Sequence, residues 1–413
     1  MSLSVIIATW GPLRSSSGGP NRVAYDLLKG LLSVSDQLLD VYFADFDKGF
    51  VREVRELSEL EFVARDLFQK EGGTNWRGIL KNIVTSMPSR HIQRPLFSVM
   101  AVVDAYFAER RVRSMLNTAP RADVLHIHGV HWKGNDLIGR LSDNYKLVWT
   151  EHSKGSLLRE LEQIRDLLKL EVLRKAIERT YENLIWRSDR IVFPSQGAVR
   201  LFEEYTGWHI SRERLSIVYN GIEDPVDTWE TEFMGTFEKG LFVTVAQHVP
   251  EKGLDWIIEG LALVRRPWRW VVIGEFTPWS AYLQGLVDRF RLGSRVAFLG
   301  ALPKKEVLRW VARSEAVIHA PHVAVFDLAL LEAMALSRPV FATPVGGNVE
   351  ALGEDYPLFV RTPNELASFI DGIGMELYQK VGTLNRARFI KNFTLTAMVR
   401  NYLSVYEGVV QSS

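Results

Sequence analysis

Residues 241–257 read LFVTVAQHVPEKGLDWI, an apolar run that leads through a turn into an amphipathic stretch. A short, continuously apolar run is typical of a parallel strand buried on both faces, and the amphipathic stretch after it predicts a covering helix. The same alternation recurs along the whole chain. The apolar runs of the first half are 4–9, 40–44, 124–128, 147–150, 191–194 and 216–219. Those of the second half are 241–246, 268–273, 295–299, 316–320, 340–343 and 358–360.

Two successive sets of runs joined by helical crossovers predict an α/β protein with two doubly wound, Rossmann-like domains. The length of 413 residues also suits two domains. The segment 223–239 holds Asp, Glu, Pro, Gly and Thr with weak periodicity, so we predict a linker there. The expected N-terminal domain covers 1–225 and the expected C-terminal domain covers 226–395. Because ligands of open α/β sheets bind at the carboxyl ends of the strands, we expect the site in the cleft between the domains.

The composition narrows the class of protein. Lys plus Arg number 50 and Asp plus Glu 49, so no net charge favours nucleic acid as a partner. The absence of cysteine excludes disulfides, thiolate zinc sites and cysteine nucleophiles. The first apolar run begins almost at the first residue, and no apolar run approaches the roughly 20 residues of a membrane span. We therefore expect a cytoplasmic protein.

One segment, 72–103, contains no acidic residue. Its basic and its aromatic or aliphatic residues are interleaved: Arg77, Lys81, Arg90 and Arg94 among Trp76, Ile79, Leu80 and Phe97. Such a stretch suits peripheral contact with the anionic inner face of a membrane, or binding of a phosphorylated acceptor. A solvated helix face followed by a loop around Pro88 is the alternative.

A glycine turn follows the first predicted strand. Gly18 and Gly19 precede a predicted helix that starts near Asn21. Such a turn exposes backbone N–H groups at the positive end of a helix dipole, which suits a phosphate or a sugar hydroxyl. A plain tight turn is the alternative. The turn is not G-x-G-x-x-G, so the nicotinamide fingerprint is missing.

The second half carries a stronger set of residues. Lys252, in the turn of the opening stretch, could neutralise charge that builds on a leaving phosphate. Glu332, near the start of a later predicted helix, offers a carboxylate that can accept both hydroxyls of a ribose. The paired glycines Gly346 and Gly347 let a backbone come close to a ligand.

Two pairs of residues have metal-ligand spacing. Asp45 and Asp47 form a D-x-D pair after a strand, as in metal-dependent transferases, but no other metal-type residue lies beside them. His126 and His128 point to one face of a strand, but no third histidine or acidic motif supports a metal there. We therefore predict a solvated strand end for the first pair, and packed or hydrogen-bonded histidines for the second.

Taken in order, these blocks resemble the family-4 glycosyltransferases of the GT-B fold. The blocks that carry the resemblance are Gly18-Gly19, DVLHIH at 123–128, TEH at 150–152, FPS at 193–195, YNGI at 219–222, PEKG at 250–253, EAMA at 332–335 and the tail from 392 to 406. The resemblance implies two facing domains, with a last helix over 396–413 that crosses back onto the first. It also implies a hexosyltransferase that moves a sugar from a nucleotide sugar to a glycan, lipid-linked or small-molecule acceptor. In that family, transfer retains the anomeric configuration and needs neither a metal nor another cofactor.

The resemblance assigns roles where residues match. His152 and Lys252 would be catalytic: the histidine would face the donor sugar from the first domain, and the lysine would hold the donor diphosphate. The donor-binding residues implied are Gly18, Gly19, Asn220, Gln247, Phe326, Asp327, Leu328 and Glu332. Glu151 adjoins His152 but points the opposite way on its strand, so the two are not a ready acid–base pair.

Three positions depart from the family pattern. Gln247 stands at the phosphate-binding arginine, Ala324 at the first glutamate of the E-x7-E pair, and Asp327 at a glycine. One phosphate charge and one acceptor for a sugar hydroxyl are therefore lost or replaced, and Asp327 and His322 are the candidates to replace that acceptor. We expect an unusual donor pocket. A non-catalytic GT-B-like subunit that binds a partner, and a GT-B sugar phosphorylase or epimerase, are the alternatives.

Overall fold

The computed structural model describes residues 3–10, 13, 20–34, 39–46, 50–56, 58–60, 112, 114, 119–130, 144–163, 171–229 and 237–412. The chain divides into two compact units. Unit 1 comprises Met1–Pro194, Val199–Val218 and Val399–Ser413, and unit 2 comprises Ser195–Ala198 and Tyr219–Met398. The boundaries expected at 225 and 395 both fall inside unit 2 as its contacts define it.

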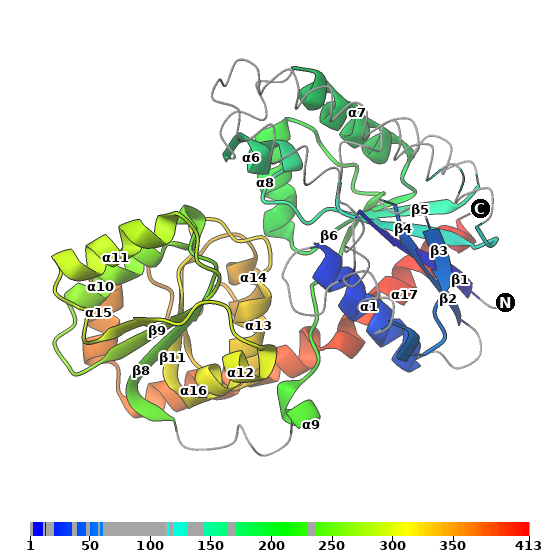
Figure 1. Ribbon diagram of the computed structural model, residues 1–413. Coiled ribbons are helices and arrows are strands. Elements are labelled where there is room, and N and C mark those ends of the chain that lie inside the picture. The colour runs from blue at the N-terminus through cyan, green and yellow to red at the C-terminus, as the bar shows by residue number, and fades with distance from the viewer. Residues whose placement is uncertain are drawn as a thin grey trace, which may run out of the picture. The chain divides into compact units, whose positions relative to one another are not determined.

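Unit 1 is built on a seven-stranded sheet with the order β3-β2-β1-β4-β5-β6-β7. All neighbouring strands are parallel except β2 and β3. The strands are β1 (Leu3–Thr9), β2 (Leu39–Asp45), β3 (Phe50–Glu53), β4 (Val124–His128), β5 (Lys146–Thr150), β6 (Arg190–Phe193) and β7 (Leu215–Ile217). The helices described with them are α1 (Pro20–Val34), α6 (Leu157–Gln163), α7 (Glu171–Arg187), α8 (Gln196–Thr206) and α17 (Leu395–Gln411), as Figure 1 shows.

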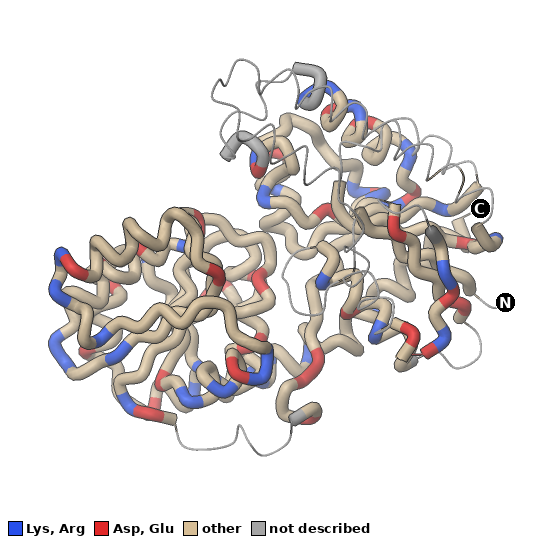
Figure 2. Tube along the Cα trace, viewed as in Figure 1, with Lys and Arg blue, Asp and Glu red and all other residues tan. Residues whose placement is uncertain are grey.

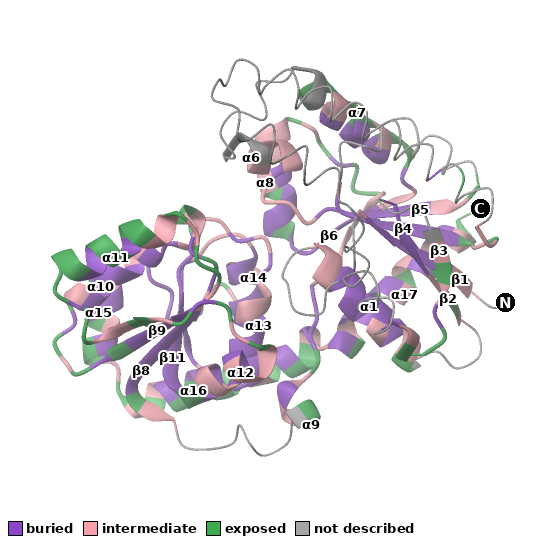
Figure 3. Ribbon diagram, in the orientation of Figure 1, coloured by how far each residue is buried: buried purple, intermediate pink, exposed green. Residues whose placement is uncertain are grey.

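Unit 2 is built on a five-stranded, all-parallel sheet with the order β10-β9-β8-β11-β12. Its strands are β8 (Glu238–Val245), β9 (Arg269–Ile273), β10 (Val296–Phe298), β11 (Ser314–His319) and β12 (Val340–Ala342). Its helices are α9 (Pro225–Trp229), the 3₁₀ turn η3 (Pro250–Lys252), α10 (Leu254–Ala262), α11 (Trp279–Arg289), α12 (Lys304–Arg313), α13 (Leu328–Ala335), α14 (Gly347–Leu352), α15 (Pro363–Gly372) and α16 (Met375–Asn392). Helix α10 packs with α11 and α15, and α13 packs with α12 and α16, so helices cover the buried strands on both faces (Figure 3).

Two strand predictions were wrong. Strand β3 was missed because it reads FVRE, with two charges, and pairs antiparallel with β2 at the edge of its sheet. An edge strand needs no continuous apolar run. Conversely, the run 358–360 forms no strand. Only Phe359 bridges to Ala342, because β12 beside it is three residues long.

The predicted linker at 223–239 is wrong in its first part. Helix α9 forms there and packs against α13, while residues 230–236 lie outside the described residues. Asp224 precedes α9, and its carboxylate accepts hydrogen bonds from the Arg386 guanidinium on α16 at 2.6 and 2.7 Å. A helix of five residues has fewer than two turns, so no apolar periodicity could reveal it.

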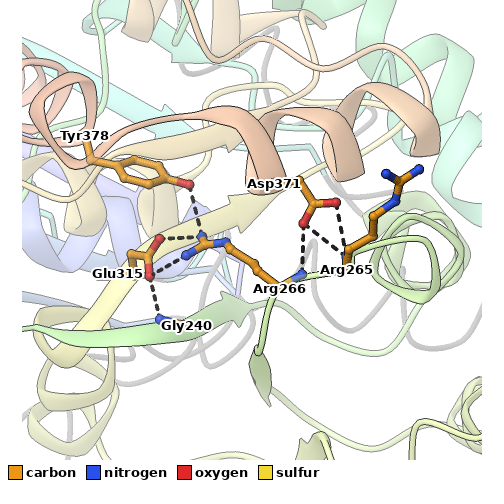
Figure 4. Close-up of polar contacts among 6 residues, drawn as sticks. All are labelled: Gly240, Arg265, Arg266, Glu315, Asp371 and Tyr378. Atoms are coloured by element: carbon orange, nitrogen blue, oxygen red, sulfur yellow. Dashed lines mark hydrogen bonds and ion pairs between the residues drawn. The ribbon is translucent and has the colours of Figure 1, made fainter.

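A buried ion pair fixes the amino end of the unit 2 sheet (Figure 4). Glu315, at the start of β11, has a side chain with no exposed surface and binds the Arg266 guanidinium. It also accepts the backbone N–H of Gly240 on β8. Asp371, on α15, accepts the backbone N–H groups of Arg265 and Arg266 at 3.1 Å. These contacts hold a helix and two strands together at the amino end of the sheet, opposite the loops that follow β8 and β11.

Charged residues of both signs are spread along the described chain of each unit (Figure 2), in keeping with the near-zero net charge. Among the described residues, no helix is long and apolar enough to cross a membrane. The basic segment 72–103 lies outside the described residues.

Candidate functional site

The order of the unit 2 sheet defines where a ligand would bind. Strand β8 lies at the centre, and the chain continues from it to β9 on one side, while β11 and β12 lie on the other. In open α/β sheets, ligands bind at the carboxyl ends of the strands where the strand order reverses. The loops that follow β8 and β11 at this point carry Gln247, Lys252 and Asp327.

A close backbone approach brings the first of these loops against the second. The turn η3 ends at Gly253, which has a left-handed conformation with φ of 62°. A Cβ atom at Gly253 would lie 2.2 Å from the carbonyl oxygen of Ala320, just after β11, so only glycine fits. The backbone N–H of His322 then donates to the carbonyl of Glu251 at 2.8 Å. The position of Lys252 relative to the second loop is therefore fixed by backbone contacts.

The side chains of Lys252 and Asp327 form an ion pair. Lys252 Nζ lies 2.9 Å from Asp327 Oδ2, and His319 Nε2 lies 3.2 Å from the same oxygen. Burial on its own would raise the pKa of Asp327, but the positive charge of Lys252 and the contact with His319 outweigh it and hold the pKa well below its usual range. Asp327 is thus ionised, and it balances the charge of the lysine.

The loop that carries Asp327 is held along its whole length. Its backbone carbonyls accept hydrogen bonds as follows: Pro321 from Thr343 Oγ1 at 2.6 Å, Ala324 from Gly347 N at 3.2 Å, Val325 from Ser195 Oγ at 2.7 Å and Phe326 from Asn220 Nδ2 at 3.1 Å. Such a loop presents its side chains in one arrangement.

The glycine pair Gly346 and Gly347 allows a close approach to the loop after β11, and its approach to a ligand stays a prediction. A Cβ atom at Gly346 would lie 1.9 Å from the carbonyl oxygen of Ala324, and one at Gly347 would lie 2.2 Å from that of Val325. The close approach that the glycines permit is therefore to this loop.

Glu332 also has a partner that the sequence analysis missed. It is buried on α13, and its carboxylate forms an ion pair with Lys304 at the start of α12. Gln247 is exposed and donates from Nε2 to Glu275 at 3.2 Å. Unit 2 thus has two lysine–carboxylate pairs, Lys252–Asp327 and Lys304–Glu332, and a neutral amide at Gln247, where the family pattern has an arginine.

The other expected donor-binding residues are placed as follows. Asn220 is buried and supports the loop through its amide, and the ring of Phe326 is buried and stacks on that of Tyr219 with centroids 5.1 Å apart. Leu328 is the first residue of α13. Gly18 and Gly19 lie outside the described residues. Contact of these residues with a donor stays a prediction.

In unit 1, His152 follows β5 and meets the end of β4. Its Nε2 atom lies 3.0 Å from Nδ1 of His128. His126, on the same face of β4, is buried and hydrogen-bonded to Tyr406 and Thr150. The prediction of packed, hydrogen-bonded histidines is confirmed for 126 and 128, but a third histidine, 152, does join them. Parallel strands bring their carboxyl ends together, and sequence spacing alone does not show which neighbours meet.

Glu151 and His152 have different hydrogen-bond partners. The carboxylate of Glu151 accepts the backbone N–H of Ser153 at 2.6 Å. Burial raises the pKa of Glu151 to about 7, while it lowers the pKa of His152 to about 3. The two residues have separate surroundings, although neither lies on β5, which ends at Thr150.

The prediction of a solvated strand end at Asp45 is wrong. Asp45 is fully buried at the end of β2, because β1 and β3 flank it, and Asp47 lies outside the described residues. Within the described part of the chain, no three His, Asp or Glu residues are grouped so that they could hold a metal ion.

Two Rossmann-like units, the second with charged side chains gathered where its strand order reverses, define a fold of the GT-B class. Residues 17–224 match the family described as Glycosyltransferase Family 4, and residues 239–375 match the one described as Glycosyl transferases group 1. The chain belongs to this group 1, family-4 glycosyltransferase family.

Individual relatives are distant. One component of the human phosphatidylinositol N-acetylglucosaminyltransferase is 27% identical over 191 residues, which are 45% of this chain and 38% of the relative. An uncharacterized glycosyltransferase of Methanocaldococcus jannaschii, MJ1178, is 25% identical over 264 residues, 61% of this chain and 71% of the relative. The structure of Anabaena HepE in complex with UDP and glucose has a TM-score of 0.62 at 15% identity, over 98% of this chain and 100% of that one. The last likeness concerns the fold alone.

Proposed function

We propose that this protein transfers a hexose from a nucleotide-sugar donor to a glycan, lipid-linked or small-molecule acceptor. The observation that carries the proposal is the placement of Lys252 in a glycine-terminated turn where the strand order of unit 2 reverses. Anabaena HepE, which has this fold, forms a complex with UDP and glucose, and that supports a nucleotide sugar as the donor. The name of the human relative favours the lipid-linked class of acceptor.

Lys252 is the residue that would stabilise the leaving group. The diphosphate gains negative charge as its bond to the sugar breaks, and a cation fixed beside it stabilises the transition state. An ammonium has three N–H donors, of which one is directed to Asp327. His152, from unit 1, is the second catalytic residue, and it faces the sugar of the donor.

Asp327 is the substitute for the missing sugar-hydroxyl acceptor. Its Oδ2 atom is engaged by Lys252 and His319, whereas Oδ1 accepts no hydrogen bond from the described residues. The side chain is 22% exposed, so Oδ1 is within reach of a ligand. The other candidate, His322, is exposed and uses its backbone N–H to hold the loop after β8. Glu332 is the residue for the ribose, and a ribose there competes with Lys304 for its carboxylate.

We also propose that the transfer retains the anomeric configuration and requires no metal. In metal-dependent transferases a divalent cation neutralises the leaving diphosphate, and a fixed lysine can supply that charge instead. Retention is the property of the family that the motifs resemble.

The test is incubation with UDP-, GDP-, ADP- and dTDP-sugars, in which water or an added glycan or lipid acceptor takes the sugar, with nucleotide release measured with and without phosphate and with EDTA. Release in EDTA without phosphate is expected with one donor, and NMR of the product gives its anomeric configuration. Lys252→Ala should lower turnover by about 10²–10³. Lys239→Ala, exposed near the amino end of β8, is the matched control and should retain turnover.

Other outcomes separate the alternatives. Release only with phosphate would indicate a phosphorylase. Neither release nor binding at millimolar donor would indicate a non-catalytic subunit, which the neutralised Lys252 and the uncharged Gln247 would then explain. Loss of activity in EDTA that manganese restores would contradict the metal-independent mechanism.

A further inference from the structure

Three histidines meet at the carboxyl ends of β4 and β5. The parallel register pairs His128 with Thr150, and His152 follows two residues later. His126 and His128 are buried, whereas His152 is partly exposed. The rings of His128 and His152 are stacked, with an angle of 14° between their planes, and Nδ1 of the first lies 3.0 Å from Nε2 of the second.

His126 has partners at both ring nitrogens. Nδ1 lies 2.7 Å from the hydroxyl of Tyr406, and Nε2 lies 2.6 Å from Oγ1 of Thr150. Thr150 Oγ1 in turn lies 3.2 Å from the hydroxyl of Tyr402. Both tyrosines belong to α17, at the end of the chain. His126 therefore joins this helix to the sheet of unit 1, and it has no nitrogen left for a ligand.

His128 differs from His126 in one respect. Its Nε2 atom is buried and has no hydrogen-bond partner among the described residues, so the contact with His152 is its one polar contact there. Burial lowers the pKa of both histidines, so both rings are neutral at pH 7. A neutral imidazole has one N–H and one bare nitrogen. The contact between the two rings can then be made in only two ways.

In the first arrangement, His128 donates from Nδ1–H to the bare Nε2 of His152. The nitrogen left buried on His128 is then an acceptor without a donor. In the second arrangement, His152 donates from Nε2–H, and His128 is left with a buried N–H that has no acceptor. Among backbone groups, a buried N–H without a partner is rarer than an under-satisfied carbonyl, and by analogy we take the first arrangement as the more stable.

We infer that His128 is a positioning residue that holds His152 as the Nδ1–H tautomer. In this form, Nδ1 of His152, which His128 does not contact, carries the hydrogen. His152 therefore donates a hydrogen bond to the nucleotide sugar, at a sugar hydroxyl oxygen or a phosphate oxygen, and does not act as a base. This last step rests on the proposed function, whereas the tautomer itself does not.

The tautomer can be read by NMR on protein with ¹⁵N-labelled histidine, because protonated and bare ring nitrogens have different shifts. The wild type should show Nδ1–H at His152. In His128→Asn, the amide nitrogen takes the place of Nδ1, so this tautomer should persist. His128→Phe has no donor, so both tautomers of His152 should be populated. Tyr402→Phe removes a hydroxyl from the same cluster without touching His152, and it should leave the spectrum of His152 unchanged.

Turnover is the second readout. Loss of one hydrogen bond corresponds to a roughly tenfold effect at most, so His128→Phe should lower kcat by up to about tenfold, and His128→Asn should restore it. An Nε2–H tautomer of His152 in the wild type would overturn the inference. So would a His128→Phe variant with wild-type tautomer and kcat. The NMR result does not require a known donor, so failure of the tautomer and failure of the proposed function are distinguishable.

Discussion

In the proposed site, the carboxylate of Asp327 pairs with Lys252 and accepts a sugar hydroxyl. Asp327→Asn should separate these two contacts. The substitution keeps the shape of the side chain and removes its charge. Lys252 then loses the anion that lies 2.9 Å from its Nζ atom, so its charge is available to a diphosphate. The asparagine oxygen can still accept a sugar hydroxyl, but as a neutral acceptor. A nucleoside diphosphate should therefore gain affinity, and its sugar conjugate should lose most or all of that gain.

The magnitudes follow from burial and charge. The two side chains are 16% and 22% exposed, so their attraction exceeds the ~0–1 kcal/mol of an exposed pair. In the wild type, the phosphate has to compete with this attraction for Lys252. Removal of the attraction should tighten binding of the nucleoside diphosphate by about three- to tenfold. A hydrogen bond to a charged group contributes about 1.5–3 kcal/mol, against about 1 kcal/mol for a neutral one. The sugar contact should therefore weaken by roughly tenfold.

The assay is titration calorimetry of wild type and Asp327→Asn with a nucleoside diphosphate and the matching nucleotide sugar. The ratio of the two dissociation constants isolates the sugar contact, and it should change by roughly tenfold. Glu251→Gln, in the turn beside Lys252, removes a nearby charge and should leave the ratio unchanged.

Two results would refute this reasoning. An unchanged ratio would show that Asp327 does not contact the sugar. Weaker binding of the nucleoside diphosphate would show that Asp327 orients Lys252 for the phosphate and does not compete with it.

Three further predictions concern other carboxylates. Glu332→Ala should raise the donor KM by about 10- to 100-fold, because the ribose hydroxyls lose their hydrogen bonds to a charged acceptor. The change in kcat should be smaller. Steady-state kinetics in which kcat alone fell would contradict this. Arg266→Met should lower the free energy of unfolding in urea by about 3–5 kcal/mol, because it leaves the buried Glu315 charge without its cation. A double variant that also changes Glu315→Met should recover much of that loss, and equal losses in both variants would argue against a charge effect. Burial raises the pKa of Glu151 to about 7, so its contribution to stability is present below about pH 4.5 and lost as the pH rises to 7. Glu151→Gln should therefore gain about 2–3 kcal/mol over wild type between pH 5 and 8, and parallel pH profiles in urea unfolding would contradict this. The comparison with wild type is needed because the buried histidines, whose pKa values are lowered, change stability in the opposite direction as the pH falls below about 6.5.

The fold could be predicted because buried parallel strands have continuous apolar runs. Eleven of the twelve strands in the described residues lie on predicted runs, and the misses are the short charged edge strand β3 and the run 358–360. Strand β3 has a neighbour on one side only, and the run 358–360 lies beside the three-residue strand β12. Apolar patterning does not report on those situations.

The partners within the site could not be predicted. Lys252 and Glu332 follow from motifs, but Lys304 and His319 lie in segments without a motif, and they matter because they pair with carboxylates. The pair of Lys252 and Asp327 joins residues 75 positions apart, and it depends on a glycine that lets two loops touch. Spacing in the sequence has no information on such contacts, because they form between loops that the pairing of parallel strands brings together.

The departures at Ala324 and Asp327 can be understood as one change in the loop. Ala324 is 2% exposed, and its carbonyl is held by Gly347, so a glutamate there would bring a charge into a packed position. Burying a carboxylate without a cation is strongly unfavourable. Three residues later, the side chain is 22% exposed and lies beside Lys252 and His319, so a carboxylate is compensated. In the site we propose, the loop presents its acceptor from 327 instead of 324, and the same carboxylate neutralises Lys252. With Gln247 also uncharged, we expect less of the affinity for the proposed donor to come from the diphosphate, and more from the sugar and the nucleoside.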